Sequence, residues 1–435
     1  MAATLISRAL VWAALLAILV PYCFAFRYNQ TRYGDVHASD EQDIYSAEAE
    51  AMIKHDESEE AEVGRDPLAA TSQYQLIGQQ DHGDIGVPGG AEFTSFKVNE
   101  EGDEEIAGFI SKDLDEKTIE HLFIVLHGRL RDGNGYWKML NKSIDKARDD
   151  NFTGTDRKMA VLAPQFFSTK FNSGQYKKNQ LAWDDLNAWQ PGGQANHPAN
   201  TSLTSFDVLD GLVKLHSDKE KYPNLKNVTV VGHGGGGQLV QRYSALGNDP
   251  PDNVHVRYIH GDPSSCMYFT KDRPVLPYTE TSNKSCDSYN IWRYGFDQFP
   301  GTGGKRMTPK EYFKQYVSRD IVSIVGLQDT GSAGDTSCMG NVQGGVNRRT
   351  RNLIWFRYIN TLARTNEDLE GFPASFEDLP DWSDAVDGKS HLRLVVVKDV
   401  AHNAEELFEG DLGREVLFHD GDIDEGWRPK KDNNN

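Results

Sequence analysis

Two residues of catalytic type follow apolar runs in the C-terminal half of the chain. Asp329 comes directly after IVGLQ, and His402 comes shortly after LRLVVVKDV. A carboxylate that hydrogen-bonds one imidazole nitrogen orients the ring, so that the other nitrogen can act as a general base. Asp335 lies in the same loop as Asp329 and is an alternative acid, while Asp399 competes from a position close to His402. We expect Asp329 to serve as the acid and His402 as the base.

A glycine-rich turn, GHGGGG at 232–237, precedes both residues. It follows the β-branched run NVTVV, and its first five residues have the G-x-S-x-G frame of a nucleophile elbow. The order of turn, Asp329 and His402 is the nucleophile–acid–base order of hydrolases with such an elbow. The serine position is nevertheless occupied by Gly234. Because removal of the nucleophile lowers kcat by about 10⁶-fold in a well-studied triad, we expect serine-hydrolase activity to be impaired or absent.

An oxyanion hole is predicted beside this turn. IVLHGRL ends an apolar run with His127, Gly128 and Arg129, where a backbone N–H can face the elbow. The N–H of Gly235 would be the second donor. His127 has a second interpretation, in which it holds the loop by hydrogen bonds without touching a substrate.

Three other interpretations remain open. Gly232, Gly234 and Gly237 match G-x-G-x-x-G, and Asp262 follows as a candidate ribose ligand, which would indicate dinucleotide binding. That fingerprint normally opens a fold on its first strand, whereas several strand-like runs precede this one. His402 could instead act as a general base on water or on a substrate C–H, giving a hydrolase or lyase without a covalent intermediate.

The last interpretation assigns the nucleophile to another loop. The segment GDPSSCMYF contains Ser264, Ser265 and Cys266 beyond the next strand-like run, but it has no elbow signature. Further side chains are candidates for the wall of a pocket, although the aromatic ones have packing as their alternative: His127, His233, Trp183, Tyr289 and Trp292.

Alternating β and α patterns must position these residues. Strand-like runs occur at 104–111, 121–128, 159–166, 227–234, 254–261, 321–328 and 392–400. Helical patterns occur between them, for example at 205–218, 237–246 and 348–362. This alternation predicts an α/β class with a mostly parallel, doubly wound sheet, whose ligands bind at the carboxyl ends of the strands. Interruptions at about 167–204 and 264–318 are too long for simple connections, so we expect insertions over the site.

A combination of motifs resembles a known family. They are VLHG, VLAPQF, LAWDD followed by W, VVGHGGGGQLVQRY, GDPSSCMYF, CDSYNIWRYGF, DTSCMGNVQGGVNRR and AHNAEELF. Together, over roughly 80–420, they resemble secreted α/β-hydrolase-fold proteins of fungi and other microbes, whose elbow commonly reads GHSAGGQ. The resemblance implies an α/β-hydrolase fold with Asp329 as acid and His402 as base. This chain departs from the family at the elbow, where serine is replaced by Gly234 and the next residue is Gly235.

The N-terminus is typical of a secreted precursor. Arg8 precedes the apolar run ALVWAALLAILV, which is shorter than the roughly 20 residues of a membrane span. We expect a signal peptide at 1–25, an acidic disordered leader at 26–75, one hydrolase-fold domain at 76–425 and a disordered tail at 426–435. Secretion is consistent with N-glycosylation at Asn29, Asn141, Asn151, Asn200 and Asn283, whereas Asn227 begins a predicted buried strand.

Charge and cysteine content limit the partners. The net charge of −19 argues against nucleic acid or an anionic membrane, leaving a small-molecule, peptide or ester ligand. Without CxxC or HExxH spacing, we expect no metal and no cofactor. Signal cleavage removes Cys23 and leaves three cysteines. Cys286 and Cys338 lie in loop-like sequence and are predicted to form a disulfide, whereas Cys266 adjoins a predicted strand. The sequence does not indicate an oligomeric state.

Overall fold

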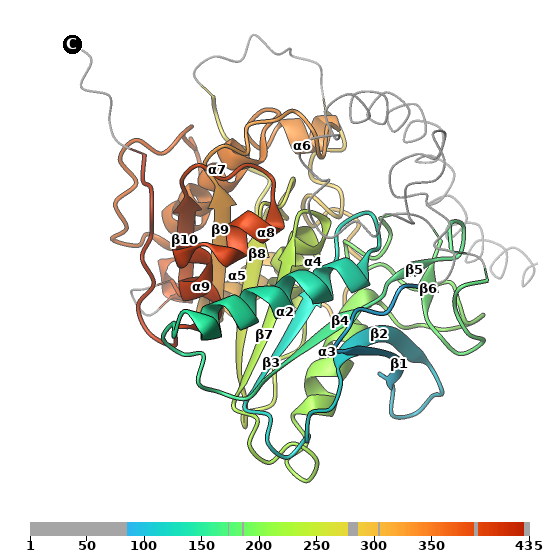
Figure 1. Cartoon of the computed structure of the whole chain (residues 1–435). Coiled ribbons are helices and arrows are strands. Elements are labelled where there is room, and N and C mark those ends of the chain that lie inside the picture. The colour runs from blue at the N-terminus through green and yellow to red at the C-terminus, as the bar shows by residue number, and fades with distance from the viewer. Residues whose placement is uncertain are drawn as a thin grey trace, which may run out of the picture. The chain divides into compact units, whose positions relative to one another are not determined.

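The computed structural model describes residues 85–429, apart from 173, 185–186, 277–285, 303–304 and 387–389. Eight strands of the described residues form one sheet, in the order β1-β2-β4-β3-β7-β8-β9-β10 (Figure 1). Their bounds are Ala91–Lys97, Glu105–Ser111, Met159–Pro164, His121–Leu126, Asn227–His233, His255–Gly261, Asp320–Gly326 and Leu392–Val397, in that order. The predicted signal peptide at 1–25 and the acidic leader at 26–75 lie outside the described residues, as do Asn29 and Asn283.

The sheet is parallel except at one edge. β1 pairs with β2, and β2 with β4, in antiparallel fashion, while the pairs from β4 to β10 are parallel. Every one of the seven predicted strand runs overlaps a strand. β1 is not among them, because AEFTSFK alternates between buried and exposed side chains and contains two charged residues. A central parallel strand such as β3 is buried at every position and is easier to recognise.

Helices cover both faces of the sheet (Figure 1). Alternate strand residues face opposite sides, so Phe123 and Val125 of β3 belong to one apolar cluster and Ile124 to the other. The cluster of Phe123 also contains side chains of α2 (Gly133–Asp149), α8 (Ala404–Glu409) and α9 (Asp411–Phe418). The cluster of Ile124 contains side chains of α3 (Ser205–His216), α4 (Gly235–Leu246), α5 (Pro309–Ser318) and α7 (Arg348–Ala363).

This strand order, with its antiparallel edge and a sharp turn between β7 and α4, is that of the α/β-hydrolase fold. The predicted fold class is therefore confirmed. Because the parallel strands all end at one edge of the sheet, the residues that follow β3, β7, β8, β9 and β10 are brought to the same region.

The two long interruptions contain little regular structure. The first, 167–204, includes the short strands β5 (Phe167–Ser168) and β6 (Ala182–Trp183), which pair with each other. The second, 264–318, ends with helix α5, whose side chains pack in the same cluster as those of α4. Cys286 within it is bonded to Cys338 at the start of the short helix α6 (Cys338–Asn341), with their Cα atoms 5.7 Å apart. The disulfide prediction is confirmed, and Cys266 is a buried free thiol.

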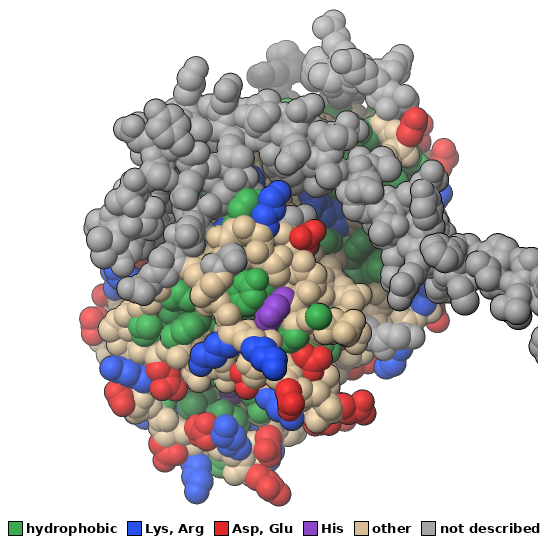
Figure 2. All heavy atoms as spheres, turned by 90° about the vertical axis from the view of Figure 1, so that its right-hand side faces the viewer, with side chains coloured by type: hydrophobic (Ala, Val, Ile, Leu, Met, Phe, Trp, Pro, Cys, Tyr) green, Lys and Arg blue, Asp and Glu red, His purple; other side chains and the backbone are tan. Residues whose placement is uncertain are grey.

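Two further properties of the described residues are the apolar character of the helices and the distribution of charge on one face. Within the described part of the chain, no helix combines the length and apolar character needed to cross a bilayer. Figure 2 shows the side of the molecule that carries β1, β2, β5 and β6, and basic and acidic side chains are interspersed on its visible part.

Candidate active site

The turn between β7 and α4 has the backbone shape of a nucleophile elbow. Gly234 adopts φ 54° and ψ −113°, a conformation that is strained for residues with a side chain. Its N–H donates to the carbonyl of Gly261 at the end of β8 (2.9 Å), which fixes the turn against the next strand. A Cβ at Gly236 would lie 2.3 Å from the carbonyl oxygen of Leu126. The glycine at 236 is therefore explained by close packing of α4 on β3, without any phosphate ligand.

His402 faces the elbow as a catalytic base would. A Cβ built on Gly234 would lie 3.1 Å from His402 Nε2, so a serine hydroxyl there would be within hydrogen-bonding reach of that nitrogen. The other ring nitrogen, Nδ1, lies 3.0 Å from Asp329 Oδ2. Since an ionised carboxylate only accepts, Nδ1 carries the proton and Nε2 presents its lone pair when the ring is neutral. The structure thus brings Gly234, His402 and Asp329 together in the order that their sequence positions predict.

Asp329 is held in its ionised form by its neighbours. It is 2% exposed, and burial by itself would raise its pKa. The positive character of His402 and the Arg348 guanidinium, 3.4 Å away at the start of α7, outweigh burial and hold the pKa of Asp329 below its ordinary value. An ionised Asp329 can orient His402 and stabilise an imidazolium.

The alternative acids do not contact His402. Asp335 accepts hydrogen bonds from the backbone N–H and the hydroxyl of Ser337, at 3.2 and 2.5 Å. Asp399 is exposed on the turn after β10 and has φ 60°. The geometry therefore selects Asp329 among the three candidate aspartates.

Asp262 lies beneath the site and is unavailable to a ribose. It is fully buried, and its Oδ1 accepts a hydrogen bond from the N–H of Gly326 (3.1 Å). Burial, and then the nearby Asp329 carboxylate, raise the pKa of Asp262 well above its ordinary value and favour its neutral form. The dinucleotide interpretation loses its candidate ribose ligand, and the glycines that suggested it belong to the elbow.

A cluster of possible metal ligands also lies here. His233, Asp262 and His402 offer ligand atoms within 4.8 Å of one another. The rings of His233 and His402 lie face to face at a tilt, however, with centroids 4.2 Å apart and planes 30° from parallel. Each imidazole donates its lone pair in the ring plane, so two rings in this arrangement do not converge on one ion at the roughly 2.0–2.1 Å that zinc requires. Burial lowers the pKa of His233 well below its ordinary value, and the neutral ring serves as packing against His402. We assign no metal to this cluster.

The predicted oxyanion loop follows β3 and lies against the start of α4. A Cβ at Gly235 would lie 3.4 Å from the backbone nitrogen of Arg129. His127 is fully buried, and its Nε2 accepts a hydrogen bond from the N–H of Phe166 (3.0 Å), so its Nδ1 donates to the carbonyl of Gly128 (2.8 Å). His127 therefore holds the loop and does not line a pocket, which corrects the prediction in favour of its alternative.

Gln190 is a residue of this site that sequence reasoning missed. It is 2% exposed, and its Nε2 has no hydrogen-bond partner among the described residues. That nitrogen lies 2.5 Å from the point where a Cβ of Gly235 would be. An unsatisfied buried donor typically costs about 1–3 kcal/mol, so its presence beside the elbow requires an explanation. The signal that the sequence offers is its position directly after Trp189, which follows LAWDD.

The serines and the cysteine after β8 are structural. Ser264 Oγ accepts a hydrogen bond from Gln238 Nε2 (2.8 Å), and Ser265 donates to Gln238 Oε1 (3.1 Å). Burial raises the pKa of the Cys266 thiol to about 12, which keeps it protonated and unreactive at neutral pH. Their proposed role as a substitute nucleophile finds no geometric support, because these side chains tie the loop after β8 to α4.

Two of the aromatic candidates pack against other aromatic side chains. Trp183 is fully buried against Phe166, with ring centroids 5.1 Å apart, and its Nε1 donates to the carbonyl of Gly193 (2.8 Å). Trp292 packs against Phe299 with centroids 4.5 Å apart. The prediction of Trp183 as a pocket wall is corrected to packing because its ring is fully buried, whereas Trp292 is only partly buried and stays a candidate. Tyr289 is half-buried and lies against the guanidinium of Arg273.

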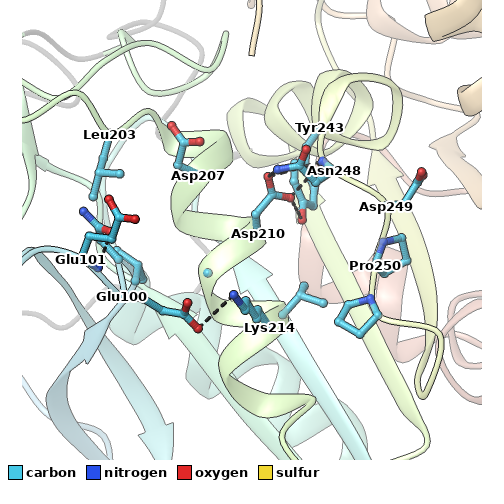
Figure 3. A pocket seen from close by; sticks show the side chains of 15 residues that line it. Glu100, Glu101, Leu203, Asp207, Asp210, Lys214, Tyr243, Asn248, Asp249 and Pro250 are labelled. Atoms are coloured by element: carbon cyan, nitrogen blue, oxygen red, sulfur yellow. Dashed lines mark hydrogen bonds and ion pairs between the residues drawn. The ribbon is translucent and has the colours of Figure 1, made fainter. Parts of the chain in front are cut away.

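A separate cleft of about 440 Å³ opens at the other end of α4 (Figure 3). Its charged groups are largely engaged with one another: Lys214 pairs with Glu100 (2.9 Å), and Asp210 accepts hydrogen bonds from Tyr243 (2.9 Å) and Asn248 (2.7 Å). Burial raises the pKa of Asp210 to about 6. An acidic cleft without a nucleophile or an unpartnered donor does not suggest a reaction, so the elbow remains the candidate site.

Of three comparisons with known proteins, only the one with solved structures gives matches. No family model matches the sequence, and the search of curated proteins found no match. Similar solved structures include LpqC, a poly(3-hydroxybutyrate) depolymerase from Bordetella parapertussis, with 15% identity, a TM-score of 0.49 and coverage of 77% of this chain and 92% of that one. Poly(aspartic acid) hydrolase-1 from Sphingomonas sp. KT-1 shows 17% identity, a TM-score of 0.48 and coverage of 73% and 95%. The siderophore hydrolase EstB from Aspergillus nidulans shows 13% identity, a TM-score of 0.35 and coverage of 77% of this chain and 95% of that one.

These neighbours are hydrolases, and this chain has a hydrolase-like α/β scaffold. At such low identities, its fold assignment rests on the strand order and the elbow geometry described above.

Proposed function

We propose that this protein is a pseudo-hydrolase, an α/β-hydrolase-fold binding protein that keeps its pocket but lacks the serine nucleophile. One observation carries the proposal: His402 Nε2 lies 3.1 Å from where a Cβ of residue 234 would be, and residue 234 is glycine. The base, its orienting acid and the oxyanion loop surround a position that has no hydroxyl. Without a nucleophile, the covalent acyl-enzyme route is closed, because no oxygen can attack the carbonyl carbon.

Restoring the hydroxyl tests the proposal. We expect Gly234→Ser to gain covalent labelling by a fluorophosphonate and hydrolysis of p-nitrophenyl acetate at least about 10²-fold above wild type, since a triad residue typically contributes more than this. The Cβ of the new serine and the His402 ring must separate by a few tenths of an ångström, and the positive φ of residue 234 is the strain that a nucleophile elbow places on its serine. The wild-type chain should remain unlabelled.

Two variants separate the hydroxyl from other effects of the substitution. Gly234→Ala adds the Cβ without the oxygen and should stay inactive, and Gly234→Ser combined with His402→Ala should lose the gained activity. Strong labelling of the wild-type chain would contradict the proposal. A folded Gly234→Ser protein that is neither labelled nor active would show that the pocket lacks other features needed for catalysis besides the nucleophile.

A second function is favoured by the intact Asp329–His402 pair. His402 Nε2 has its lone pair toward the elbow and could deprotonate water or a substrate C–H, as in a hydrolase or lyase without a covalent intermediate. Substrate turnover by the wild-type chain that is lost in His402→Ala, together with the absence of fluorophosphonate labelling, would favour this function over a binding role. The ligand would be a small molecule, a peptide or an ester.

We also propose that the protein is secreted. The apolar N-terminal run with its preceding Arg8 supports export, and the Cys286–Cys338 bond supports an oxidising compartment, where disulfides persist. Asn151 and Asn200 are exposed, as glycosylated asparagines must be, and Asn141 is half-buried on α2. Secretion from cells expressing the full chain, with a mass loss on treatment with an N-glycosidase, is the expected result.

A further inference from the structure

The elbow contains a polar group that the proposed triad geometry does not use. Gln190 reaches it from the first long interruption, and its unpartnered amide nitrogen lies 2.5 Å from the ideal Cβ position of Gly235. Any residue with a side chain at 235 would therefore displace this amide. Because Gly235 has no Cβ, the Gln190 amide can lie close to the backbone at the start of α4.

Further donors point to the same place. The first N–H groups of a helix have no partner within it, and α4 is a twelve-residue helix that begins at Gly235 with no side-chain cap on Gly234. Such an N-terminus attracts negative charge through its N–H groups and its dipole. Gln190 is 98% buried and contributes side-chain N–H donors beside this terminus. Helix and side chain together offer donors to a ligand oxygen.

The surrounding charges permit one small anion. Asp329 is balanced by Arg348 and by its hydrogen bond to His402. Burial raises the pKa of Asp262 and favours its neutral form. His402 can take up a proton at Nε2 and donate it to an oxygen in the space left by Gly234. Arg348 is engaged by Asp329, so its charge is not available to balance the second charge of a phosphate.

We propose that Gly234, Gly235 and Gln190 form a carboxylate-binding site, in which one carboxylate oxygen accepts from Gln190 and the N-terminus of α4 and the other faces His402 Nε2. The inference rests on the proposed function, because a serine at 234 would fill the space. It names the class of ligand that the pocket would hold: a compound with a free carboxylate. No bond is made or broken, and the carboxylate stays bound in place of an acyl intermediate.

Titration with sodium butyrate, followed by ligand-detected NMR or calorimetry, tests the site. We expect wild type to bind butyrate and to bind methyl butyrate, its uncharged ester, at least about tenfold more weakly, because hydrogen bonds to an ionised acceptor are the stronger ones. Gln190→Leu, which removes the amide, and Gly235→Ala, which displaces it, should each weaken butyrate binding by about tenfold or more. Gln194→Leu makes the same change at an exposed position of the same segment and should leave binding unchanged.

Several results would overturn the site. The proposal fails if wild type does not bind butyrate, or if it binds butyrate and methyl butyrate equally. It also fails if wild type and Gln190→Leu bind butyrate equally at equal folded fraction. Competition by inorganic phosphate as effective as that by butyrate would replace a carboxylate site with a general anion site. Fluorophosphonate labelling of wild type would contradict the pseudo-hydrolase function independently. A chain that is unlabelled and binds no butyrate would remove only the carboxylate site.

Discussion

At the level of single residues, the orientation of His402 is maintained without the serine that it would serve. Its Nδ1 is fixed by Asp329, and Asp329 is fixed by Arg348. These contacts lie on the side of the ring away from Gly234, so they do not depend on residue 234. A chain can therefore lose its nucleophile by one substitution and retain the geometry of the base and acid.

This independence predicts the behaviour of the acid in a restored enzyme. In the Gly234→Ser background, Asp329→Asn should lower kcat by about 10³–10⁴-fold with little change in KM, because an amide no longer selects the ring tautomer that accepts a proton. Asp335→Asn, which touches Ser337 and not His402, is the matched control and should leave kcat nearly unchanged. Comparable losses in both variants would show that the assignment of Asp329 as the acid is wrong. Steady-state kinetics with p-nitrophenyl acetate provides the measurement.

At the level of elements, the strand–turn–helix unit of β7 and α4 is shaped by close backbone packing. Gly232 lies against Gly236, with 2.4 Å between its ideal Cβ and the carbonyl carbon of Gly236. A Cβ built on Gly237 would likewise lie 2.4 Å from the carbonyl oxygen of Gly261 on β8. The glycine run that resembles a phosphate loop in sequence is thus a packing requirement of a helix that starts directly against two strands.

Gly236→Ala should destabilise the whole domain. The added methyl group would lie 2.3 Å from the backbone oxygen of Leu126 and 2.8 Å from that of His127, and backbone atoms of a central strand cannot move aside. We expect the free energy of unfolding to fall by about 1–3 kcal/mol, the usual cost of overpacking. Urea denaturation measures the change. Gly421→Ala, at a position with no atom within 4 Å of the new methyl, should shift stability by less than about 0.5 kcal/mol, and an equal effect in both would contradict the packing argument.

At the level of the whole molecule, the disulfide joins two loops beyond the sheet. Cys286 belongs to the second long interruption, and Cys338 begins α6 in the loop between β9 and α7. The bond closes a sequence separation of 52 residues that includes α5 and β9. It therefore restrains the loop between β9 and α7. This loop carries Asp329, which orients His402, and leads to Arg348, which contacts Asp329.

Removal of the disulfide should lower the stability of the domain. We expect the double variant Cys286→Ser, Cys338→Ser to lose about 2–4 kcal/mol of unfolding free energy, because the unfolded chain regains the freedom that a loop of this length had lost. Wild type treated with a reductant should match the variant in urea denaturation, whereas reduction should not destabilise the variant further. A double variant as stable as the oxidised wild type would show that the bond adds no restraint.

The sequence was sufficient to predict the parallel strands and the chain order of the elbow, the acid and the base. Buried parallel strands such as β3 are apolar at every position, so they are recognisable without a structure. β1 was missed because an edge strand needs only one buried face. Asp329 and His402 were predictable because residues that follow parallel strands converge at one edge of the sheet. Gln190 was not predictable, because no periodicity constrains a loop residue.

Sequence alone determined that this is an α/β-hydrolase scaffold, that residue 234 has no side chain and that Asp329 precedes His402 in triad order. These properties follow from residue type and chain order, which can be read from the sequence without a structure. Only the tertiary structure decided that Asp329 and not Asp335 reaches His402, that Asp262 is buried, that Trp183 packs in the core and that Gln190 lies against Gly235. Each of these depends on the path of a loop through space, where a shift of a few ångströms makes or removes a hydrogen bond.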